Sequence, residues 1–409
     1  MTEKEFALSI KSLGGRAFIV GGFVRDQFLG ISAKDRDYVV TGLSLENIPW
    51  EKPVGHDAPV FLVEIDGQKC EIALARKEKK NGVGYHGFTF FSDENVTIEQ
   101  DLFRRDLTIN AMAIDCLTGE LFDPFNGQED LENGILRHVS DAFAEDPLRV
   151  FRVARFVSRF GFSVHPSTLE VMKSLKEEIK NLKGERVWIE LQKTLCEAFP
   201  ARFFETLDSC GLLDHWFPEI SKLHVSDMHD GTAFRHVMNL LNSTDEFKIR
   251  FGLLCHDFGK GETDPDKHPH HFGHDSLGVP CIEEFCKRLR IPNELKEFGV
   301  KCCSEHMRVK DLSKMKPGKV VKFVLENEKH LYDVFRVSFL DSTCREGADV
   351  FSETEKFAIA HDRIADALSA KDGVTGKDLV AEGIKPGPLL GQVLFQRRVE
   401  LFRKLEKGE

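Results

Sequence analysis

The residues best suited to chemistry in the first part of the chain are three acids at the start of apolar runs. Asp35 and Asp37 open the run DRDYVV, and Glu71 opens EIALA. Alternate side chains of a strand share a face, with Cα atoms about 7 Å apart, so Asp35 and Asp37 would repel each other unless a divalent cation bound both. Hard oxygen ligands suit Mg²⁺, and with Glu71 on a neighbouring strand they could hold two ions for phosphoryl transfer. The same pattern fits solvent-facing acids at a strand edge.

A phosphate could be held at the turn after the first apolar run. AFIV leads into Gly21 and Gly22, and FVRD with Arg25 follows. Glycines at a strand-to-helix turn let backbone N–H groups approach a phosphate, and the helix N-terminus favours anions. We therefore expect Gly22 to contact a nucleotide and Arg25, on the first helical turn, to face its triphosphate. Paired glycines also end strands in plain turns.

An acid and two arginines, Asp146, Arg149 and Arg152, are spaced for one face of a helix. Residues 145–160 carry apolar side chains at helical spacing before Gly161, which predicts an amphipathic helix over this whole range. Asp146 and Arg149 would then lie one turn apart, with Arg152 a further turn along. Cytosine and adenine present an amino donor beside a ring-nitrogen acceptor, and uracil and guanine present the reverse, so an acceptor from Asp146 and donors from Arg149 match C and A. The competing interpretation is a surface salt bridge.

These motifs stand in a fixed order with a fourth, RRDLTINA at residues 104–111. Together they resemble the catalytic core of the polymerase-β-type nucleotidyltransferases, in particular the class II tRNA nucleotidyltransferases and their bacterial poly(A) polymerase relatives. The resemblance implies that Arg105 contacts the triphosphate and that Asp106 binds the ribose 2′-hydroxyl, which a deoxynucleotide lacks. It also implies that EDPLR, residues 145–149, is the protein template for the incoming base, and that Arg152 reaches the nucleotide.

Further segments extend the resemblance, which runs from about Phe18 to Glu190. Residues 130–137 (DLENGILR) match the flexible segment between head and neck, and residues 77–87 (KEKKNGVGYHG) resemble the mobile loop that helps the family switch from C to A. Residues 184–190 (GERVWIE) resemble the neck helix. There we expect a structural role, with an internal salt bridge and a packed Trp188.

A second constellation lies in the C-terminal half, where LLCHDFGKG contains His256 and Asp257. An adjacent His–Asp pair, with His236 upstream and an aspartate downstream, resembles the HD phosphohydrolase superfamily. The resemblance implies that His236, His256, Asp257 and a late aspartate ligate a divalent metal. Asp341 is our candidate for the last, although the Leu before it and Cys344 depart from the superfamily's pattern. Neighbouring helical residues point about 100° apart, so both reach one ion only where other helices converge. Imidazole with carboxylate suits Ni²⁺, another transition metal or Mg²⁺.

The secondary-structure elements that would position these residues indicate an α+β chain. We expect a polymerase-β-like head with a small mixed sheet, followed by an all-helical neck, body and HD-type tail. AFIVGG and DYVV predict strands, and VFLVEIDGQKCEIALA predicts a hairpin around Asp66-Gly67. From about residue 127 the periodicity is helical, interrupted by a polar surface loop at 265–280 that holds His268 and His270. We expect four domains: head 1–118, neck with the base-reading helix 119–200, HD-type domain 201–350 and helical tail 351–409.

Composition limits the class of protein. With 41% hydrophobic residues among 409, the chain can bury more than one core. Nothing resembles a signal peptide or a membrane span, so we expect a cytoplasmic protein. Ten scattered cysteines without a CxxC pair predict free thiols. The net charge of −11 means that RNA contact must rest on local basic patches.

We therefore expect a CCA-adding enzyme, monomeric or homodimeric, that transfers CMP, CMP and AMP from CTP and ATP to the 3′ end of tRNA and releases pyrophosphate. We also expect the HD-type region to hydrolyse 2′,3′-cyclic phosphate or 2′-phosphate ends. Alternatives within the class are a CC-only or A-only adding enzyme and a poly(A) polymerase. A different class would be an HD phosphohydrolase with a degenerate head, and a non-catalytic RNA-binding module is disfavoured by the net acidity and the intact set of acids.

Overall fold

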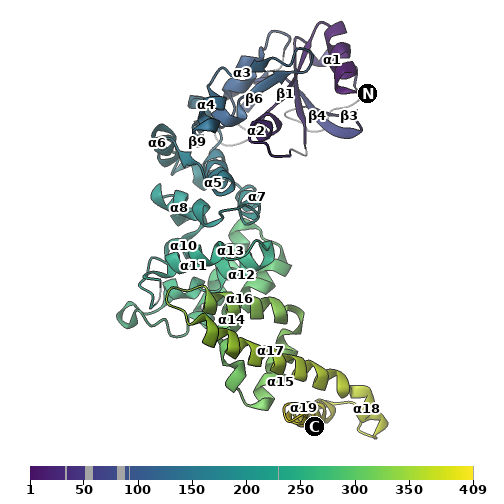
Figure 1. Cartoon of the computed structure of the whole chain (residues 1–409), viewed down its shortest axis with the longest axis vertical. Helices are drawn as coiled ribbons and strands as arrows, with labels where there is room; N and C mark the ends of the chain where they lie inside the picture. The colour runs from purple at the N-terminus through teal and green to yellow at the C-terminus, as the bar shows by residue number, and fades with distance from the viewer. Residues whose placement is uncertain (33–34, 51–58, 81–87, 92, 229, 409) are drawn as a thin grey trace. The chain divides into compact units, whose positions relative to one another are not determined.

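The computed structural model describes residues 1–32, 35–50, 59–80, 88–91, 93–228 and 230–408. Their contacts divide the chain into two compact units, Met1–Leu191 with Arg202–Leu212, and Gln192–Ala201 with Leu213–Glu409. Within the described residues, strands occur in the first unit and the second is helical (Figure 1). The four-domain division is finer than these two units and stays a prediction.

A six-stranded mixed sheet, in the order β3-β4-β2-β1-β7-β8, forms the centre of the first unit. Its strands are β1 (Arg16–Val20), β2 (Asp37–Thr41), β3 (Val60–Ile65), β4 (Gln68–Leu74), β7 (Ala113–Asp115) and β8 (Leu121–Phe122). β2 and β4 run parallel, and the other neighbouring pairs run antiparallel. The predicted α+β class with a small mixed sheet is confirmed.

The predicted hairpin is also confirmed, because β3 and β4 pair antiparallel on either side of Asp66 and Gly67. Both turn residues have positive φ, 51° and 76°, as a two-residue turn between twisted strands requires. A second antiparallel pair, β5 (Lys77–Lys80) and β6 (Phe88–Phe91), flanks residues 81–87. Most of the predicted mobile loop, 77–87, therefore lies outside the described residues.

The described part of the first unit also contains four short α-helices before the neck. They are α1 (Glu3–Ser12), α2 (Gly22–Phe28), α3 (Ile98–Phe103) and α4 (Gly127–Glu132). Capping boxes begin α1 and α3, where Thr2 and Thr97 accept the backbone N–H of the third helical residue. Phe18, Val39 and Leu102 are buried together in one core cluster, so α3 is fixed against β1 and β2. This packing places Arg105, two residues after α3, beside Gly21 at the end of β1.

The rest of the first unit is the neck. Its elements are β9 (Ile135–Leu136), the 3₁₀ turn η4 (Asp141–Glu145), α5 (Arg149–Phe160), β10 (Ser163–Val164), α6 (Pro166–Ser174), α7 (Gly184–Thr194) and α8 (Ala201–Ser209), of which α7 and α8 run across the unit boundary. α5 ends at Gly161 in the left-handed conformation, φ 71°, as predicted. Its predicted start is wrong, because the helix begins at Arg149 and Asp146 is extended, with φ −116° and ψ 100°. Pro147 explains the difference, since the residue before a proline is disfavoured in helical conformation.

The second unit is built from α-helices. They are α9 (Leu213–Trp216), α10 (Pro218–Ser221), α11 (Ala233–Leu241), α12 (Phe247–Cys255), α13 (His274–Leu289), α14 (Asn293–Asp311), α15 (Pro317–Asn327), α16 (Leu331–Thr343), α17 (Val350–Gly373), α18 (Gly376–Ala381) and α19 (Pro388–Leu405). The predicted loop 265–280 is too long, because α13 already begins at His274. All ten cysteines are free thiols, as predicted. Among the described residues no helix is both long and apolar enough to cross a bilayer.

Candidate functional site

The acids of the head meet where β2 begins. Asp37 is the first residue of β2 and is the register partner of Glu71 on the parallel strand β4, while Asp35 lies just before the strand. Desolvation raises the pKa of Asp37, the negative charges of Glu71 and Asp35 raise it further, and the Arg105 cation opposes them. The predicted placement of Glu71 on the strand beside Asp37 is confirmed. Mutual repulsion of this kind is what a divalent cation would relieve, and metal binding itself stays a prediction.

A glycine turn and an arginine lie next to these acids. β1 ends at Val20, the register partner of Asp37, and Gly21 follows with φ 70°. A Cβ on Gly21 would lie 2.9 Å from Arg105 Nη1, so a side chain there would collide with the guanidinium. Gly22 is the first residue of α2, so the paired glycines form the predicted strand-to-helix turn. The glycine turn and the Arg105 cation therefore lie beside the carboxylates, an arrangement suited to a triphosphate with its counter-ions.

Asp101, which sequence reasoning missed, fixes the orientation of Arg105. Its buried carboxylate accepts bonds from Arg104 Nη2 at 2.6 Å and Arg105 Nη2 at 3.1 Å, and Arg105 Nη1 also donates to the carbonyl oxygen of Asn110 at 3.3 Å. Burial raises the pKa of Asp101, but the two arginines outweigh it and hold that pKa below its usual value. An acid three and four positions before two arginines, at the end of a helix, was the available signal.

Arg25 is buried between the head and α5. Its guanidinium donates to Asp26 Oδ1 at 2.8 Å and to Asn110 Oδ1 at 2.6 Å, and it lies 5.0 Å from the ring centroid of Phe160. Asp26 in turn accepts a bond from Arg159 at 2.9 Å. Arg25 is the fourth residue of α2, and its contact with a triphosphate stays a prediction.

Asp106 and Arg152 form an ion pair, with Asp106 Oδ2 2.7 Å from Arg152 Nη2. The other oxygen of Asp106 accepts bonds from Asn110 Nδ2 at 3.0 Å and from the backbone of Leu107 at 2.9 Å. Burial raises the pKa of Asp106, but Arg152 and Asn110 hold it far below its usual value, so the carboxylate is ionised at neutral pH. An ionised, oriented acceptor fits the predicted contact with a ribose hydroxyl.

Separate hydrogen bonds hold the two residues of the predicted base-reading pair, Asp146 and Arg149. Asp146 Oδ2 accepts a bond from Arg186 Nη2 at 2.9 Å, and its Oδ1 accepts the backbone N–H of Leu148 at 3.1 Å. Arg149 donates to the carbonyl oxygens of Ala142 at 2.7 Å and Arg104 at 2.6 Å. Arg186 thus forms an ion pair with a residue outside the 184–190 segment. Trp188 is buried, as predicted.

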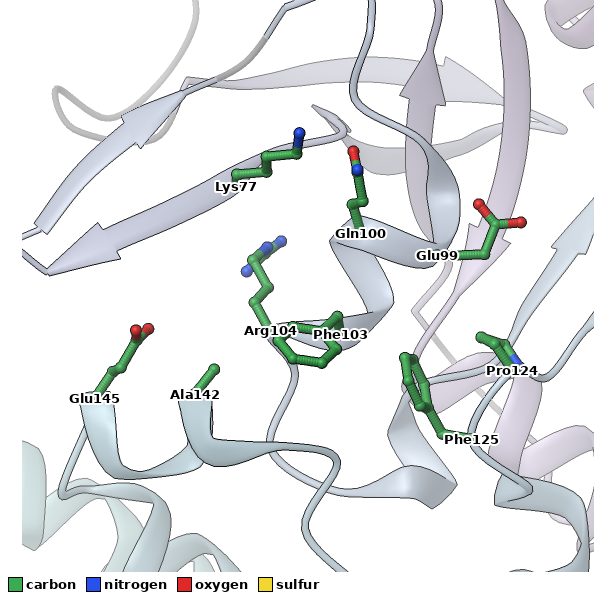
Figure 2. Close-up of a pocket in the computed structure, with 9 residues that line it drawn as sticks. All are labelled: Lys77, Glu99, Gln100, Phe103, Arg104, Pro124, Phe125, Ala142 and Glu145. Atoms are coloured by element: carbon green, nitrogen blue, oxygen red, sulfur yellow. The ribbon is translucent and has the colours of Figure 1, made fainter.

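A pocket of about 500 Å³ opens beside Arg104 and η4. Figure 2 shows its lining, in which Arg104, Lys77, Gln100 and Glu145 supply polar groups and Phe103 and Phe125 an aromatic side. The rings of Phe103 and Phe125 have centroids 6.1 Å apart. Among the described residues that line it, none is a predicted metal ligand, and the pocket borders the predicted template segment, residues 145–149, through Glu145.

In the second unit, six side chains from converging helices form a buried cluster, named here the His–Asp cluster. Its members are His236 on α11, His256 and Asp257 at the end of α12, His274 at the start of α13, His306 on α14 and Asp341 on α16. The structure brings together all of the predicted ligands, Asp341 included: His236 Nε2 lies 2.9 Å from Asp341 Oδ1, and His256 Nε2 lies 3.2 Å from Asp257 Oδ2. Their binding of a metal stays a prediction.

Close backbone packing explains why α13 starts inside this cluster. A Cβ on Gly259, two residues after Asp257, would overlap the carbonyl oxygen of His274. His274 and His306, for which the sequence suggested no role, therefore enter beside Asp257 Oδ1, at 3.4 and 3.8 Å from their Nε2 atoms. His268 and His270 lie outside the cluster on the preceding segment, as predicted.

The cluster has the chemistry of a metal site. His256 Nε2 is buried without a hydrogen-bond partner and lies 3.2 Å from Asp257 Oδ2 and 3.7 Å from Asp341 Oδ1. Asp230 Oδ2 lies 2.6 Å from Nδ1 of His236, the orienting contact that metal-ligating histidines usually have. Lysine cations balance the acids, with Lys260 2.8 Å from Asp257 and Lys310 2.6 Å from Asp341. Imidazole and carboxylate donors of this kind suit a divalent transition metal.

Comparison with known proteins shows which families and solved structures this chain resembles. Residues 17–137 match the family described as the poly A polymerase head domain, and residues 161–223 match the family described as the probable RNA and SrmB-binding site of polymerase A. Among solved structures, the CCA-adding enzyme with ATP has a TM-score of 0.64 at 23% identity, covering 98% of this chain and 89% of that one. The Thermotoga maritima CCA-adding enzyme complexed with tRNA has a TM-score of 0.66 at 22% identity, covering 100% and 95%. These structures share the fold.

Curated relatives are closer in sequence. The multifunctional CCA protein of Acinetobacter baumannii strain SDF is 39% identical over 96% of this chain and 98% of its own length. That of Nitrosococcus oceani is 39% identical over 95% of this chain and 98% of its own length. With this identity along almost the whole chain, and with the carboxylates, glycine turn and arginines assembled in its head, the chain belongs to the multifunctional CCA protein family.

Proposed function

We propose that this chain adds CCA to the 3′ end of tRNA, transferring CMP, CMP and AMP in turn from CTP and ATP and releasing pyrophosphate. The observation that carries the proposal is the register of Asp37 with Glu71 beside a glycine turn covered by Arg105. Relatives named as CCA proteins support it, as do fold neighbours solved with ATP, CTP and tRNA.

Each residue has a task that its position allows. Asp35 and Asp37, with Glu71, would hold Mg²⁺, which when bound makes the tRNA 3′-hydroxyl more acidic and neutralises the departing pyrophosphate. Arg105, whose guanidinium Asp101 holds in place, binds the triphosphate together with the N–H groups of the glycine turn. Pre-oriented donors of this kind stabilise charge without having to reorganise during the transfer.

Selection of the nucleotide falls to Asp106 of the head and to Asp146 and Arg149 of the neck. Asp106 accepts the ribose 2′-hydroxyl, and Asp146 accepts the exocyclic amino group that cytosine and adenine share. Two of the roughly four lone-pair sites on the Asp146 carboxylate are used by Arg186 and Leu148, which orients the remaining acceptors. Arg149 would donate to the ring nitrogen, so one site serves both C and A.

The test is incubation of a tRNA that lacks CCA with CTP and ATP, followed by sequencing of the 3′ ends. The proposal expects ends that stop at CCA, and Asp37→Ala should abolish C and A addition alike while tRNA binding persists. Products that stop at CC, tRNAs extended only by A when CC is already present, or long A tails would each support an alternative in place of full CCA addition.

A second activity is favoured by the His–Asp cluster, and we propose that it hydrolyses 2′,3′-cyclic phosphate or 2′-phosphate ends. The buried His256 Nε2, which has no hydrogen-bond partner and faces two carboxylates, supports it. A divalent ion there, Ni²⁺ or another transition metal, would supply an activated water. Water that opens the cyclic phosphate at its 3′-oxygen frees the 3′-hydroxyl and leaves a 2′-phosphate, and hydrolysis of that monoester releases phosphate from the position beside the hydroxyl that the head extends.

This activity is measured with 2′,3′-cyclic AMP and a panel of divalent ions. His256→Ala should eliminate hydrolysis and leave CCA addition intact, because the two activities use different ligands, and His270→Ala serves as a matched control. Absence of metal-stimulated hydrolysis in the wild type would remove this proposal. Hydrolysis without any CCA addition would instead indicate a phosphohydrolase with a degenerate head.

A further inference from the structure

Arg36 lies between the predicted metal ligands Asp35 and Asp37 in the sequence, but its side chain is bound elsewhere. Arg36 and Tyr38 both donate to Glu3 of α1, so they share one face at the start of β2. Alternation along an extended chain puts the two acids on the opposite face. We propose that Arg36 is a positioning residue for nucleotidyl transfer, which holds Asp35 and Asp37 at the separation that a divalent ion needs. The proposal deepens the transferase function proposed above and rests on it.

Two acids from separate elements hold the Arg36 guanidinium. Its Nη1 donates to Glu3 Oε2 at 3.2 Å and to Asp66 Oδ2, in the turn between β3 and β4, at 3.0 Å. The hydroxyl of Tyr38 donates to the same Glu3 oxygen at 2.8 Å. The guanidinium carbon also lies 5.2 Å from the ring centroid of Phe23, in the first turn of α2. One side chain thus joins α1, the β3–β4 turn and α2 to the start of β2.

The two acids that hold Arg36 are themselves fixed by the backbone. The N–H of Glu3 donates to Asp66 Oδ1 at 3.3 Å, and the N–H of Asp66 donates to the carbonyl oxygen of Met1 at 2.9 Å. The turn at Asp66 leads directly into β4, the strand that carries Glu71. The ion pairs of Arg36 therefore link the first two predicted metal ligands to the strand of the third.

Asp35 needs such an anchor because it lies before the point at which the sheet begins. The pairing of β2 with β1 and with β4 starts at Asp37, whose register partners are Val20 and Glu71. Asp35 precedes both pairings and is exposed. Partly exposed ion pairs contribute little to stability, but a metal site loses about 10- to 100-fold in affinity when the residues that orient its ligands are removed. Loss of Arg36 should therefore affect metal affinity more than stability.

Charge and position predict opposite effects for the loss of this arginine. Arg36 is a cation next in sequence to both acids, so charge alone would make Arg36→Gln bind a divalent ion more tightly. Loss of the anchor lets Asp35 move and makes the same variant bind the ion more weakly. The direction of the change in affinity therefore separates a positioning role from electrostatic repulsion of the ion.

The experiment titrates Mn²⁺ into the full-length chain with CTP present and tRNA absent, so that no transfer takes place. Bound Mn²⁺ is followed by electron paramagnetic resonance, and the binding that persists in Asp35→Asn with Asp37→Asn is subtracted, because it belongs to sites elsewhere. We expect the Kd for Mn²⁺ to rise about 10-fold in Arg36→Gln. Arg36→Lys, which keeps a donor and the charge, should recover part of the affinity. In transfer assays the Mg²⁺ concentration at half-maximal rate should rise in parallel, while kcat at saturating Mg²⁺ falls less.

Arg16→Gln is the matched control, because it breaks another partly exposed arginine pair of the same sheet, with Asp115 at 2.8 Å, and its Kd should not change. Arg36→Met, which keeps an apolar stem beside Phe23, is a second test of the direction, and calorimetry checks that each variant is folded. An equal rise in Arg16→Gln, or unchanged or tighter binding in both Arg36 variants, would overturn the positioning role and leave the transferase standing. Binding in the wild type that the double aspartate variant does not reduce would overturn this inference together with the proposed metal ligands.

Discussion

Replacement of Asp146 and Arg149 separates base reading from support of the neck. Asp146 pairs with Arg186, and both side chains are about a quarter exposed at 26%, so losing this pair should cost at most about 1 kcal/mol of stability. Arg149 is 8% exposed and bonds two backbone carbonyls. At ~1.5–3 kcal/mol for each charged hydrogen bond, Arg149→Ala should cost roughly 3–6 kcal/mol.

The two variants should therefore differ in stability and resemble each other in specificity. For a unit of this size, each kcal/mol lowers Tm by about 2–4 °C, so Arg149→Ala should melt at least about 4 °C below Asp146→Ala. Loss of one reading bond, worth ~1–3 kcal/mol, should lower the ratio of kcat/KM for CTP over UTP by roughly 5- to 150-fold in both.

The assay is single-turnover insertion of CTP or UTP on tRNA lacking CCA, with differential scanning calorimetry on the same preparations. Arg186→Ala is the matched control, because it removes the brace of Asp146 but keeps the acceptor, and its ratio should change less. An unchanged CTP to UTP ratio in Asp146→Ala, with only a general loss of rate, would refute base reading by this carboxylate. An unchanged Tm in Arg149→Ala would refute the bracing role of its carbonyl bonds.

Three further predictions concern the acids that hold the arginines. Asp106→Ala should reduce the preference for ribonucleotides over deoxyribonucleotides by ~1–3 kcal/mol, measured as the CTP to dCTP ratio of kcat/KM, and an unchanged ratio would exclude the 2′-hydroxyl contact. Glu190→Ala breaks a buried pair with Arg155 at 2.6 Å and should lower the unfolding free energy by ~3–5 kcal/mol in denaturant titration; a loss below about 1 kcal/mol would contradict burial of an unpaired cation. Asp101 has a lowered pKa in the fold, so its contribution is present above the unfolded value of ~3.9 and is lost as pH falls through the folded pKa. The stability gap between wild type and Asp101→Asn should thus be constant from about pH 8 to 5 and shrink below about pH 4, and a gap that grows in acid would reverse the sign of the argument.

Local sequence patterns predicted the parts of the fold that depend on residues close together in the sequence. Alternation in EIALA placed Glu71 on a strand, and Asp66-Gly67 placed the hairpin that precedes it. Gly161 ended α5 as expected. Apolar periodicity alone extends α5 back to residue 145, but Pro147 disfavours a helical conformation at Asp146, so the helix begins at Arg149.

Partners distant in sequence could not be predicted in the same way. Arg186 reaches Asp146 across 40 positions, and His306 reaches His274 across 32. No spacing rule connects such pairs, since they meet only after separate helices have packed. The histidine-rich segment made the prediction harder, because His274 enters the cluster only where Gly259 lets α13 approach. His268 and His270, in the same segment, do not enter the cluster.

The acids around the arginines suggest that orientation outweighs net charge in the transfer site. If simple attraction governed binding, Asp101→Asn would remove a negative charge near the triphosphate and lower KM for ATP. Asp101 instead holds the guanidinium of Arg105 above the glycine turn, and without it the side chain regains rotamers that must be frozen on binding. We therefore expect KM for ATP and CTP to rise in Asp101→Asn despite the more positive site. Assays at several ionic strengths separate this rise from a change in electrostatic attraction, because attraction between charges is screened by salt. A fall in KM would show that charge, and not the fixed geometry of Arg105, controls nucleotide binding.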